Sequence, residues 1–295
     1  MMKISSKAKT TLWSYLWMTP ALFLVLAFFG YSLVYAFVIS THSYNLMRSE
    51  RPFIGTANFV RYLTSPDYWQ SLWITCRFLA IVMILVVVAG LLFALLLKQK
   101  VPLRSLFRGF LMVPWVLSML VTGLIFTWIF DAQVGILNYV LRSVGLKAVP
   151  WLSEPVPAFS LLAMAYVWKV YPFAMIIFLA GLQSINDEYY EAAAVDGAGP
   201  ITRFVRITLP FLKPQFLVVI VLLSINVFNM IDMVFAITKG GPGVSTRLVS
   251  YFMYTNAFTH MEMGYSAAIA ISLFLVNLVL TIIYVKILKP EISVG

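Results

Sequence analysis

The chain has 295 residues, of which 62% are hydrophobic and only 11% are charged, and its formal net charge is +10. About a quarter of the residues of a soluble domain are charged, so this sequence has too little charge to cover a soluble globule. Its mean hydropathy of +0.93 indicates an integral membrane protein. Apolar runs of about twenty or more residues recur without the alternation of β-barrel strands, so we expect an all-α membrane protein.

Six apolar segments are long enough to cross a membrane as helices. They cover residues 12–39, 72–97, 107–130, 157–182, 212–237 and 267–288. The first follows Lys3, Lys7 and Lys9 but is too long for the apolar core of a signal peptide, and it shows no convincing A-x-A cleavage site. We therefore expect an uncleaved helix.

These spans predict a division of the chain into four parts. Residues 1–11 form a cytosolic tail, residues 12–71 the first helix with an external loop, and residues 289–295 a second tail. Residues 72–288 form a five-helix core that contains a cytosolic loop at 183–211. The external loops are too short to be independent domains.

The distribution of basic residues predicts that both termini are cytosolic. This orientation places twelve lysines and arginines inside and seven outside. The bias is sharper in the short 98–108 loop, which has four basic residues and no acidic one. The positive charge is therefore mostly a topology signal, and in the absence of an Arg–aromatic module we expect no nucleic-acid partner.

The sequence offers few groups for chemistry. Cys76 is the only cysteine, and His42 and His260 are the only histidines, so we expect no intramolecular disulfide and no metal cluster. The phosphate-binding pattern G-x-x-x-x-G-K-[ST] is missing. We therefore expect no cofactor on this chain and no enzymatic activity.

The fourth span contains an unusual segment, Trp168-Lys169-Val170-Tyr171-Pro172-Phe173. Pro172 lacks an amide donor and predicts a kink. A buried ammonium at Lys169 needs an anion or a water-filled cavity. It either attracts an acidic solute or is a structural cation paired with Asp232 or with backbone carbonyls. The aromatic side chains of this segment either pack on sugar rings or belong to the core.

The loop after the fourth span reads EAAAVDGAGPITRFVRITLP. It predicts a short helix that ends at Gly197 in the left-handed conformation, and a second helix that starts at Pro200. We expect Ile201, Phe204, Val205 and Thr208 to form one apolar edge, with Arg203 and Arg206 off that edge. Such a helix either docks into a groove of a partner or lies on the membrane surface.

The fifth span carries polar residues that are costly in a membrane. Asn226 and Asn229 are three residues apart and are expected on one helix face, with Asp232 further along the same helix. Amide groups suit a hydroxyl-rich ligand, but they also bridge helices in bundles. For Asp232 a structural role stands beside a ligand-binding one.

The loop resembles the cytoplasmic-loop signature of permease subunits in binding-protein-dependent ABC importers. The matching residues are Glu191, Ala192, Ala193, Gly197, Ile207, Leu209 and Pro210. The resemblance implies that the loop couples the membrane domain to an ATPase. The residues assigned to coupling are Glu191, Ala192, Ala193, Gly197, Ile201, Phe204, Leu209 and Pro210.

Further stretches resemble the maltose-type, carbohydrate-uptake branch of that family. They include Gly135–Asn138, the T-x-GGP-like loop at 238–242, in which Lys239 is a departure, and residues 263–268. The resemblance implies a solute pathway lined by Asn226, Asn229, Val170 and Phe173. Lys169 and Asp232 are further candidates for this pathway, because charged residues inside a membrane span are costly.

The same resemblance implies a set of partners. These are a second permease, a dimer of ABC ATPases that binds ATP and magnesium, an extracytoplasmic solute-binding protein, a carbohydrate and membrane lipid. It also implies a multi-pass protein of the bacterial cytoplasmic membrane. A permease for a non-sugar solute is the first alternative, and a secondary transporter is the second.

Overall fold

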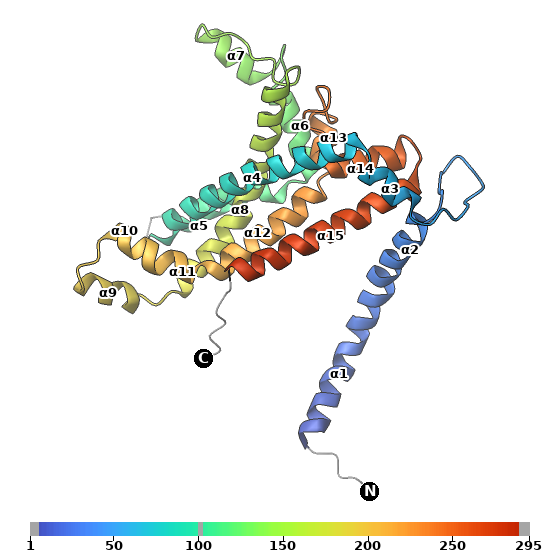
Figure 1. The fold of residues 1–295 in the computed structure, drawn as a ribbon. Coiled ribbons are helices and arrows are strands. Elements are labelled where there is room, and N and C mark those ends of the chain that lie inside the picture. The colour runs from blue at the N-terminus through green and yellow to red at the C-terminus, as the bar shows by residue number, and fades with distance from the viewer. Residues whose placement is uncertain (1–5, 100–102, 289–295) are drawn as a thin grey trace. The chain divides into compact units, whose positions relative to one another are not determined.

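The computed structural model describes residues 6–99 and 103–288, which are almost entirely helical and contain no β-strand in these ranges (Figure 1). The expected all-α fold is therefore confirmed. In chain order, the elements are α1 (Ser6–Val25), the π-helical turn η1 (Leu26–Gly30), α2 (Tyr31–Ser40), α3 (Ala57–Leu63), α4 (Pro66–Lys98), α5 (Arg104–Val116), α6 (Met119–Ile129), α7 (Ile136–Ser143), α8 (Pro155–Ser184), α9 (Glu188–Val195), α10 (Pro200–Arg203), the π-helical turn η2 (Phe204–Thr208), α11 (Leu209–Phe211), α12 (Lys213–Phe228), α13 (Asp232–Ile237), α14 (Val249–Phe258) and α15 (Met263–Leu288).

Four helical segments of the described chain are each long and apolar enough to cross a membrane. They are Trp17–Ser40, Pro66–Lys98, Pro155–Ser184 and Met263–Leu288. Two bent pairs bring the number of spans to six when each pair counts as one: Arg104–Val116 with Met119–Ile129, bent by 95°, and Pro200–Phe211 with Lys213–Phe228, bent by 63°. Six spans were expected, and the first, second, fourth and sixth agree closely in position.

The third and fifth predicted spans are not continuous helices, which corrects the sequence prediction. The segment 107–130 breaks between α5 and α6, where Leu117 has an extended backbone with ψ 151°. The segment 212–237 divides into α12 and α13, and residues 229–231 lie between them. The predicted kink at Pro172 does not interrupt α8, which continues to Ser184.

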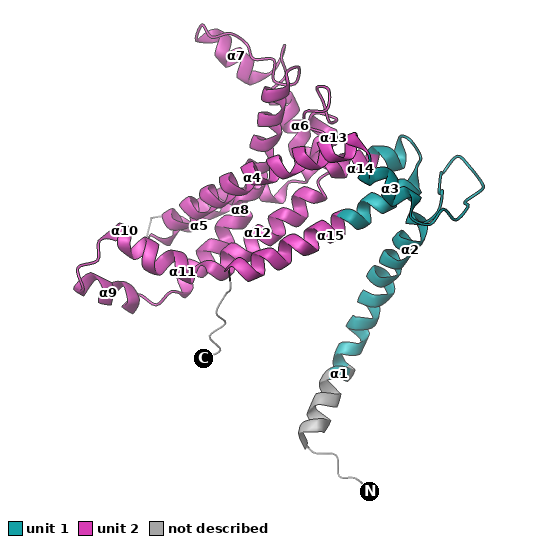
Figure 2. Cartoon of the chain, in the orientation of Figure 1, with its two compact units in different colours: residues 1–64, 255–272 teal, residues 65–254, 273–295 magenta. Residues whose placement is uncertain are grey.

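The described chain forms two compact units (Figure 2). Unit 1 comprises Met1–Thr64 and Thr255–Ser272, and unit 2 comprises Ser65–Tyr254 and Leu273–Gly295. Residues 1–5 of the predicted tail 1–11 and the whole of the predicted tail 289–295 lie outside the described residues, and the four-part division stays a prediction.

Unit 1 is held together by a buried asparagine. Asn58 of α3 donates from Nδ2 to the carbonyl oxygens of Ser40 (2.8 Å) and His42 (3.0 Å), at the end of α2. Arg61 forms an ion pair with Glu262 at 2.9 Å, and its guanidinium lies 4.2 Å from the centre of the Tyr265 ring. These contacts join α3 to the end of α2 and to the start of α15.

The core of unit 2 is the pairing of α4 with α8. Phe78 of α4 makes edge-to-face ring contacts with Phe159 and Tyr166 of α8, and all three rings are buried. Further along, a Cβ on Gly90 would lie 2.7 Å from the Cβ of Ala174. The absence of a side chain at position 90 therefore allows the two backbones to approach closely, as small residues do in membrane helices.

The helices that follow the two breaks pack against each other. A Cβ on Gly123 of α6 would lie 2.6 Å from the Cβ of Ala236 in α13. Thr127 donates a hydrogen bond to the carbonyl oxygen of Ala236 at 3.3 Å. In unit 2, α6 and α13 thus lie together at one end, and α9 and α10 lie at the other (Figure 1).

Two polar centres fix the loops beside α6 and α13. Asn138 is fully buried: its Nδ2 donates to Val149 O (3.0 Å), and its Oδ1 accepts from Val149 N (3.0 Å) and Trp151 Nε1 (3.2 Å). Arg247 donates to the Asp67 carboxylate and to Ser71 Oγ, which ties the segment before α14 to α4. These bonds give two long connections defined conformations.

Candidate coupling loop and solute pathway

The left-handed turn predicted at Gly197 is confirmed. Gly197 has φ +79° and ends α9. Gly197 N donates to Ala194 O at 3.1 Å, and Ala198 N donates to Ala193 O at 2.8 Å. This pair of bonds is the Schellman motif, which satisfies the last carbonyls of a helix and favours glycine at the left-handed position.

The second helix of the loop also starts where the sequence predicts. Gly199 is the N-cap of α10, and Pro200 is its first residue, where the missing amide hydrogen costs nothing. Ile201 and Val205 are 81% and 52% exposed, but Thr208 is buried. The predicted apolar edge is therefore interrupted, because the π-helical turn η2 changes the angular spacing and turns Thr208 inward.

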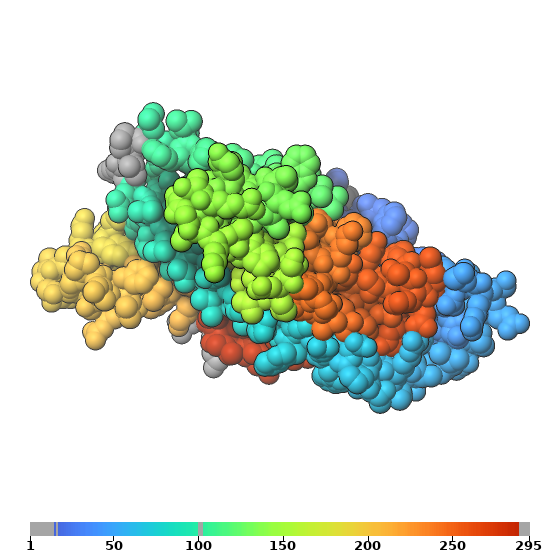
Figure 3. All heavy atoms as spheres, turned by 90° about the horizontal axis from the view of Figure 1, so that it is seen from above, coloured from blue at the N-terminus to red at the C-terminus, as the bar shows by residue number. Residues whose placement is uncertain are grey.

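Aromatic contacts hold α9 against the base of the loop. Tyr190 and Thr208 share a hydrogen bond at 3.0 Å between their hydroxyl oxygens, and the rings of Tyr189 and Phe211 lie 5.0 Å apart. The ammonium of Lys98, at the end of α4, lies 4.5 Å from the centre of the Tyr190 ring. Thus α9 and α10 project as a braced lobe at one end of unit 2 (yellow in Figure 3).

The projecting surface contains most of the residues that the sequence assigned to coupling. Glu191, Ala192, Gly197, Ile201 and Pro210 are exposed, and Ala193, Phe204 and Leu209 are partly exposed.

A groove of about 440 Å³ runs between α9 and the helices that follow. Ala193, Asp196, Arg203 and Arg206 are among the residues that line it. The Nε atom of Arg203 is buried and has no hydrogen-bond partner among the described residues. The lobe therefore combines an exposed apolar side chain, Ile201, with a groove that contains two arginine side chains.

Lys169 in α8 is buried, with 7% of its surface exposed. Its Nζ donates a hydrogen bond to the backbone carbonyl oxygen of Trp115 at 2.6 Å. Within residues 6–99 and 103–288, Lys169 forms no ion pair with Asp232. The structural partner of this cation is thus a carbonyl, one of the two kinds that the sequence left open.

The neighbours of Lys169 in α8 are divided between the core and the surface. Val170 is 5% exposed and belongs to the core of the isolated chain. Phe173 is partly exposed, and its ring stacks on that of Trp115 with 6.2 Å between centres. Tyr171 donates a hydrogen bond to Leu111 O at 3.4 Å, and its ring lies 5.1 Å from that of Phe93. Their contact with a solute stays a prediction.

The polar residues of the fifth span do not share one helix, which corrects the sequence prediction. Asn226 lies in the last turn of α12, Asn229 is the residue that follows α12, and Asp232 is the first residue of α13. Asn229 Nδ2 donates to Ile225 O at 2.7 Å and so caps α12. All three side chains are exposed, so they are available to a ligand or to a second subunit.

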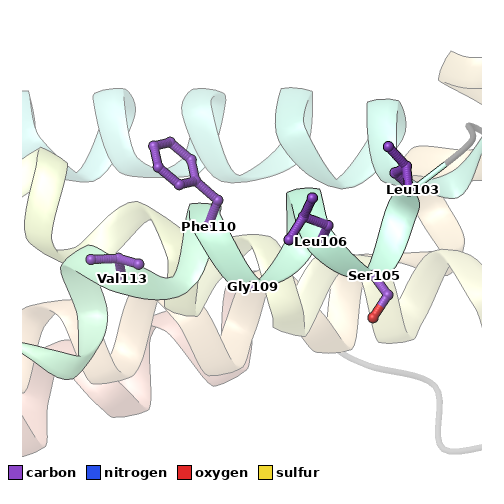
Figure 4. A pocket seen from close by; sticks show the side chains of 6 residues that line it. All are labelled: Leu103, Ser105, Leu106, Gly109, Phe110 and Val113. Atoms are coloured by element: carbon purple, nitrogen blue, oxygen red, sulfur yellow. The ribbon is translucent and has the colours of Figure 1, made fainter.

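The sequence reasoning did not single out the exposed apolar face of α5. Leu103, Leu106, Phe110 and Val113 are each more than half exposed and line a shallow recess, while Ser105 points the opposite way (Figure 4). Their helical spacing was the signal that could have found this face. The backbone carbonyl of Trp115 was also missed, because no sequence pattern marks a backbone acceptor.

The comparisons with known proteins agree on the type of protein. The family described as "Binding-protein-dependent transport system inner membrane component" matches residues 86–293. The trehalose/maltose transport system permease protein MalF of Thermococcus litoralis is 34% identical over 273 residues, which cover 92% of each chain. The sulfoquinovosyl glycerol transport system permease protein SmoG of Agrobacterium fabrum is 34% identical over 244 residues, which cover 81% of this chain and 78% of SmoG.

The fold has a counterpart among solved structures. A chain of a bacterial ABC transporter involved in the import of the acidic polysaccharide alginate matches with a TM-score of 0.81 and 20% identity. The match covers 97% of this chain and 98% of the other. At this identity the likeness concerns the fold.

The broken helical spans and the projecting loop define a multi-pass permease subunit of the inner membrane. The chain belongs to the family of binding-protein-dependent transport system inner membrane components. The resemblance on which the sequence analysis relied is thereby confirmed.

Proposed function

We propose that this chain is the transmembrane permease subunit of an ATP-driven, binding-protein-dependent importer for a carbohydrate. The names of the relatives support the solute class, since they refer to trehalose and maltose, to sulfoquinovosyl glycerol and, for AraP of Bacillus subtilis at 32% identity, to arabinooligosaccharides. The exposed amides of Asn226 and Asn229 also suit a solute rich in hydroxyl groups.

The observation that carries the transport mechanism is the braced lobe of α9 and α10. It exposes Ile201 and Val205, and it contains a groove lined in part by Asp196, Arg203 and Arg206. An exposed apolar side chain on a short projecting helix suits insertion into a groove of a partner protein. The lobe is therefore the docking site for an ABC ATPase, and loop 183–211 faces the cytosol together with both termini.

This arrangement assigns a separate role to each subunit of the importer. ATP and magnesium bind to a dimer of separate ATPase subunits, so this chain carries neither a cofactor nor a catalytic residue. It pairs with a second permease, and an extracytoplasmic binding protein delivers the solute. ATP-driven closure of the ATPases moves the lobe, and the lobe moves the spans to which it is braced.

The solute pathway lies beside the breaks of the third and fifth spans. Asn226 and Asn229 bind solute hydroxyl groups there, and Asp232 lies three residues further on. Phe173 contributes an aromatic surface for a sugar ring. Lys169 and Val170 support this surface from within unit 2, since both are buried in the isolated chain.

Calorimetry of the purified partner binding protein tests the solute class. The panel contains neutral oligosaccharides, acidic sugars and, as the control for the first alternative, amino acids and polyamines. We expect tight binding of at least one sugar and none of the amino acids or polyamines. Binding of an amino acid or a polyamine alone would contradict the carbohydrate function and favour a non-sugar permease.

A further inference from the structure

The break in the third span leaves the last backbone carbonyl groups of α5 without donors in their own helix. Helix α5 ends at Val116, and the extended backbone of Leu117 takes the chain out of the helix. The last four carbonyl groups of a helix have no partner within it. Trp115 O is one of these groups, and a polar group inside a membrane protein needs another partner.

Lys169 supplies that partner. Its Nζ lies 2.6 Å from Trp115 O, and the side chain is 7% exposed. A cation at the C-terminal end of a helix is favoured because the helix dipole is negative there. The contact thus gives the carbonyl oxygen of Trp115 a hydrogen-bond donor and gives the buried ammonium of Lys169 an acceptor.

Other contacts from α8 meet the same end of α5. Tyr171 donates to Leu111 O at 3.4 Å, and the ring of Phe173 stacks on that of Trp115. Among these contacts only the bond from Lys169 is charge-assisted and short, so it is the strongest individual link. The last turns of α5 are therefore clamped to α8.

The helix beyond the break has a different attachment. Ser118 caps α6 by accepting a hydrogen bond from Val121 N at 3.2 Å, and Thr127 links α6 to α13. The 95° bend between α5 and α6 thus separates a segment clamped to α8 from a segment packed on α13.

We propose that Lys169 is a positioning residue that caps the C-terminal end of α5 and thereby sets the break in the third span. Its ammonium serves the backbone of this chain and is not a binding site for an acidic solute. The inference deepens the proposed pathway and rests on the proposed function only for its effect on transport. The clamp itself can be measured without any solute.

Thiol labelling of the assembled complex in lipid nanodiscs tests the clamp. Cys76→Ser removes the only cysteine. Val116→Cys then reports on the last residue of α5, where the valine is 79% exposed. Val144→Cys, directly after α7, where the valine is 65% exposed, is the control site. The probe is N-ethylmaleimide, and its labelling rate is measured with Lys169, with Lys169→Met and with Lys169→Arg.

We expect Lys169→Met to change the labelling rate at position 116 at least threefold and to leave the rate at position 144 unchanged. Lys169→Arg keeps a cationic donor and should stay within twofold of the parent at both positions. An unchanged rate at position 116 in an assembled Lys169→Met complex would overturn the proposal, as would an equal effect of Lys169→Arg.

If Lys169→Met lowers the yield of the complex, the double variant with Asp232→Asn decides the outcome. Recovery of the yield would show that Asp232 is the partner of the cation and would overturn the proposal. A yield that remains low in the double variant, with a normal yield for Lys169→Arg, is the result expected for a carbonyl clamp. If labelling gives the expected rates but the parent complex, with Lys169 in place, imports no sugar, the proposed function is wrong and the clamp between Lys169 and α5 stands.

Discussion

Gly197 is the residue whose backbone conformation most directly shapes the braced lobe of α9 and α10. Its φ of +79° costs a residue with a side chain about 1–2 kcal/mol, and a β-branched residue fits least well. Gly197→Val should therefore weaken the affinity of the permease for its ATPase roughly tenfold, since about 1.4 kcal/mol corresponds to one factor of ten. Co-purification of the ATPase at rising salt concentration measures this loss.

Gly199 offers a matched control two residues away. It has φ −69°, and a Cβ there would meet nothing within 4 Å. Gly199→Ala should therefore retain the ATPase as the parent does. Equal retention in Gly197→Val and Gly199→Ala would show that the left-handed turn does not matter for docking.

Asn226 and Asn229 yield a second prediction for single residues. Each lost hydrogen bond to a neutral group costs about 0.5–1.5 kcal/mol, so the double variant with leucine at both positions should raise the apparent KM for uptake roughly five- to 150-fold. Assembly should be normal, because both side chains are exposed and their only hydrogen bond in the described chain is the cap from Asn229 to Ile225 O. Ile225→Leu is the control. Normal uptake kinetics in the double variant would exclude the pathway role, and loss of assembly would favour helix bridging.

The contact between α4 and α8 allows a prediction at the level of whole helices. A Cβ on Gly90 would lie 2.7 Å from Ala174 Cβ and 3.0 Å from the backbone nitrogen of Met175. A side chain there must separate the two helices, and overpacking of this kind costs about 1–3 kcal/mol or more. Gly90→Leu should lower the yield and the thermal stability of the purified protein in detergent.

Gly109 of α5 is the matched control, because a Cβ there would meet nothing within 4 Å. Gly109→Leu should leave stability unchanged or raise it, since leucine favours helices more than glycine does. Similar melting temperatures for the two variants would show that the α4–α8 contact is looser than its geometry indicates.

The elements differ in how far the sequence reveals them. The lobe was predictable because its signals are local: Gly197 stops one helix and Pro200 starts the next. The break after α12 was not, since Asn229, Met230 and Ile231 include neither glycine nor proline. In the third span, Pro114 lies inside α5 and the break comes later, at Leu117. Tertiary packing on α8 and α13 decides where these spans bend.

The candidate site shows the same limit. The sequence identified Lys169 as a buried cation that needs a partner, but its partner is a backbone atom 54 residues away. Residue types predict which side chains require compensation, and only the fold decides which group provides it. The apolar edge predicted from Ile201 to Thr208 is interrupted for a similar reason. The sequence pattern did not predict the π-helical turn η2, which changes the helical spacing before Thr208.

In unit 2, the lobe of α9 and α10 lies at one end, and helices α6 and α13, which follow the breaks in the third and fifth spans, lie at the other end. A secondary carrier driven by protons would need titratable groups inside the membrane that exchange protons with the solute pathway. In the described spans, Lys169 is bound to a carbonyl and Asp232 is exposed at the start of α13. This arrangement favours mechanical driving through the lobe.

Uptake into proteoliposomes tests that conclusion on the complete complex, with the partner permease, the ATPases and the binding protein. The solute is the sugar that the binding protein selects in calorimetry. In the proposed mechanism closure of the ATPases moves the lobe, so orthovanadate should reduce uptake at least tenfold, and a protonophore should leave uptake within about twofold. The complex with Gly197→Val, whose lobe is strained, should show low uptake in every condition. Uptake that a protonophore abolishes and orthovanadate leaves intact would instead identify a secondary carrier.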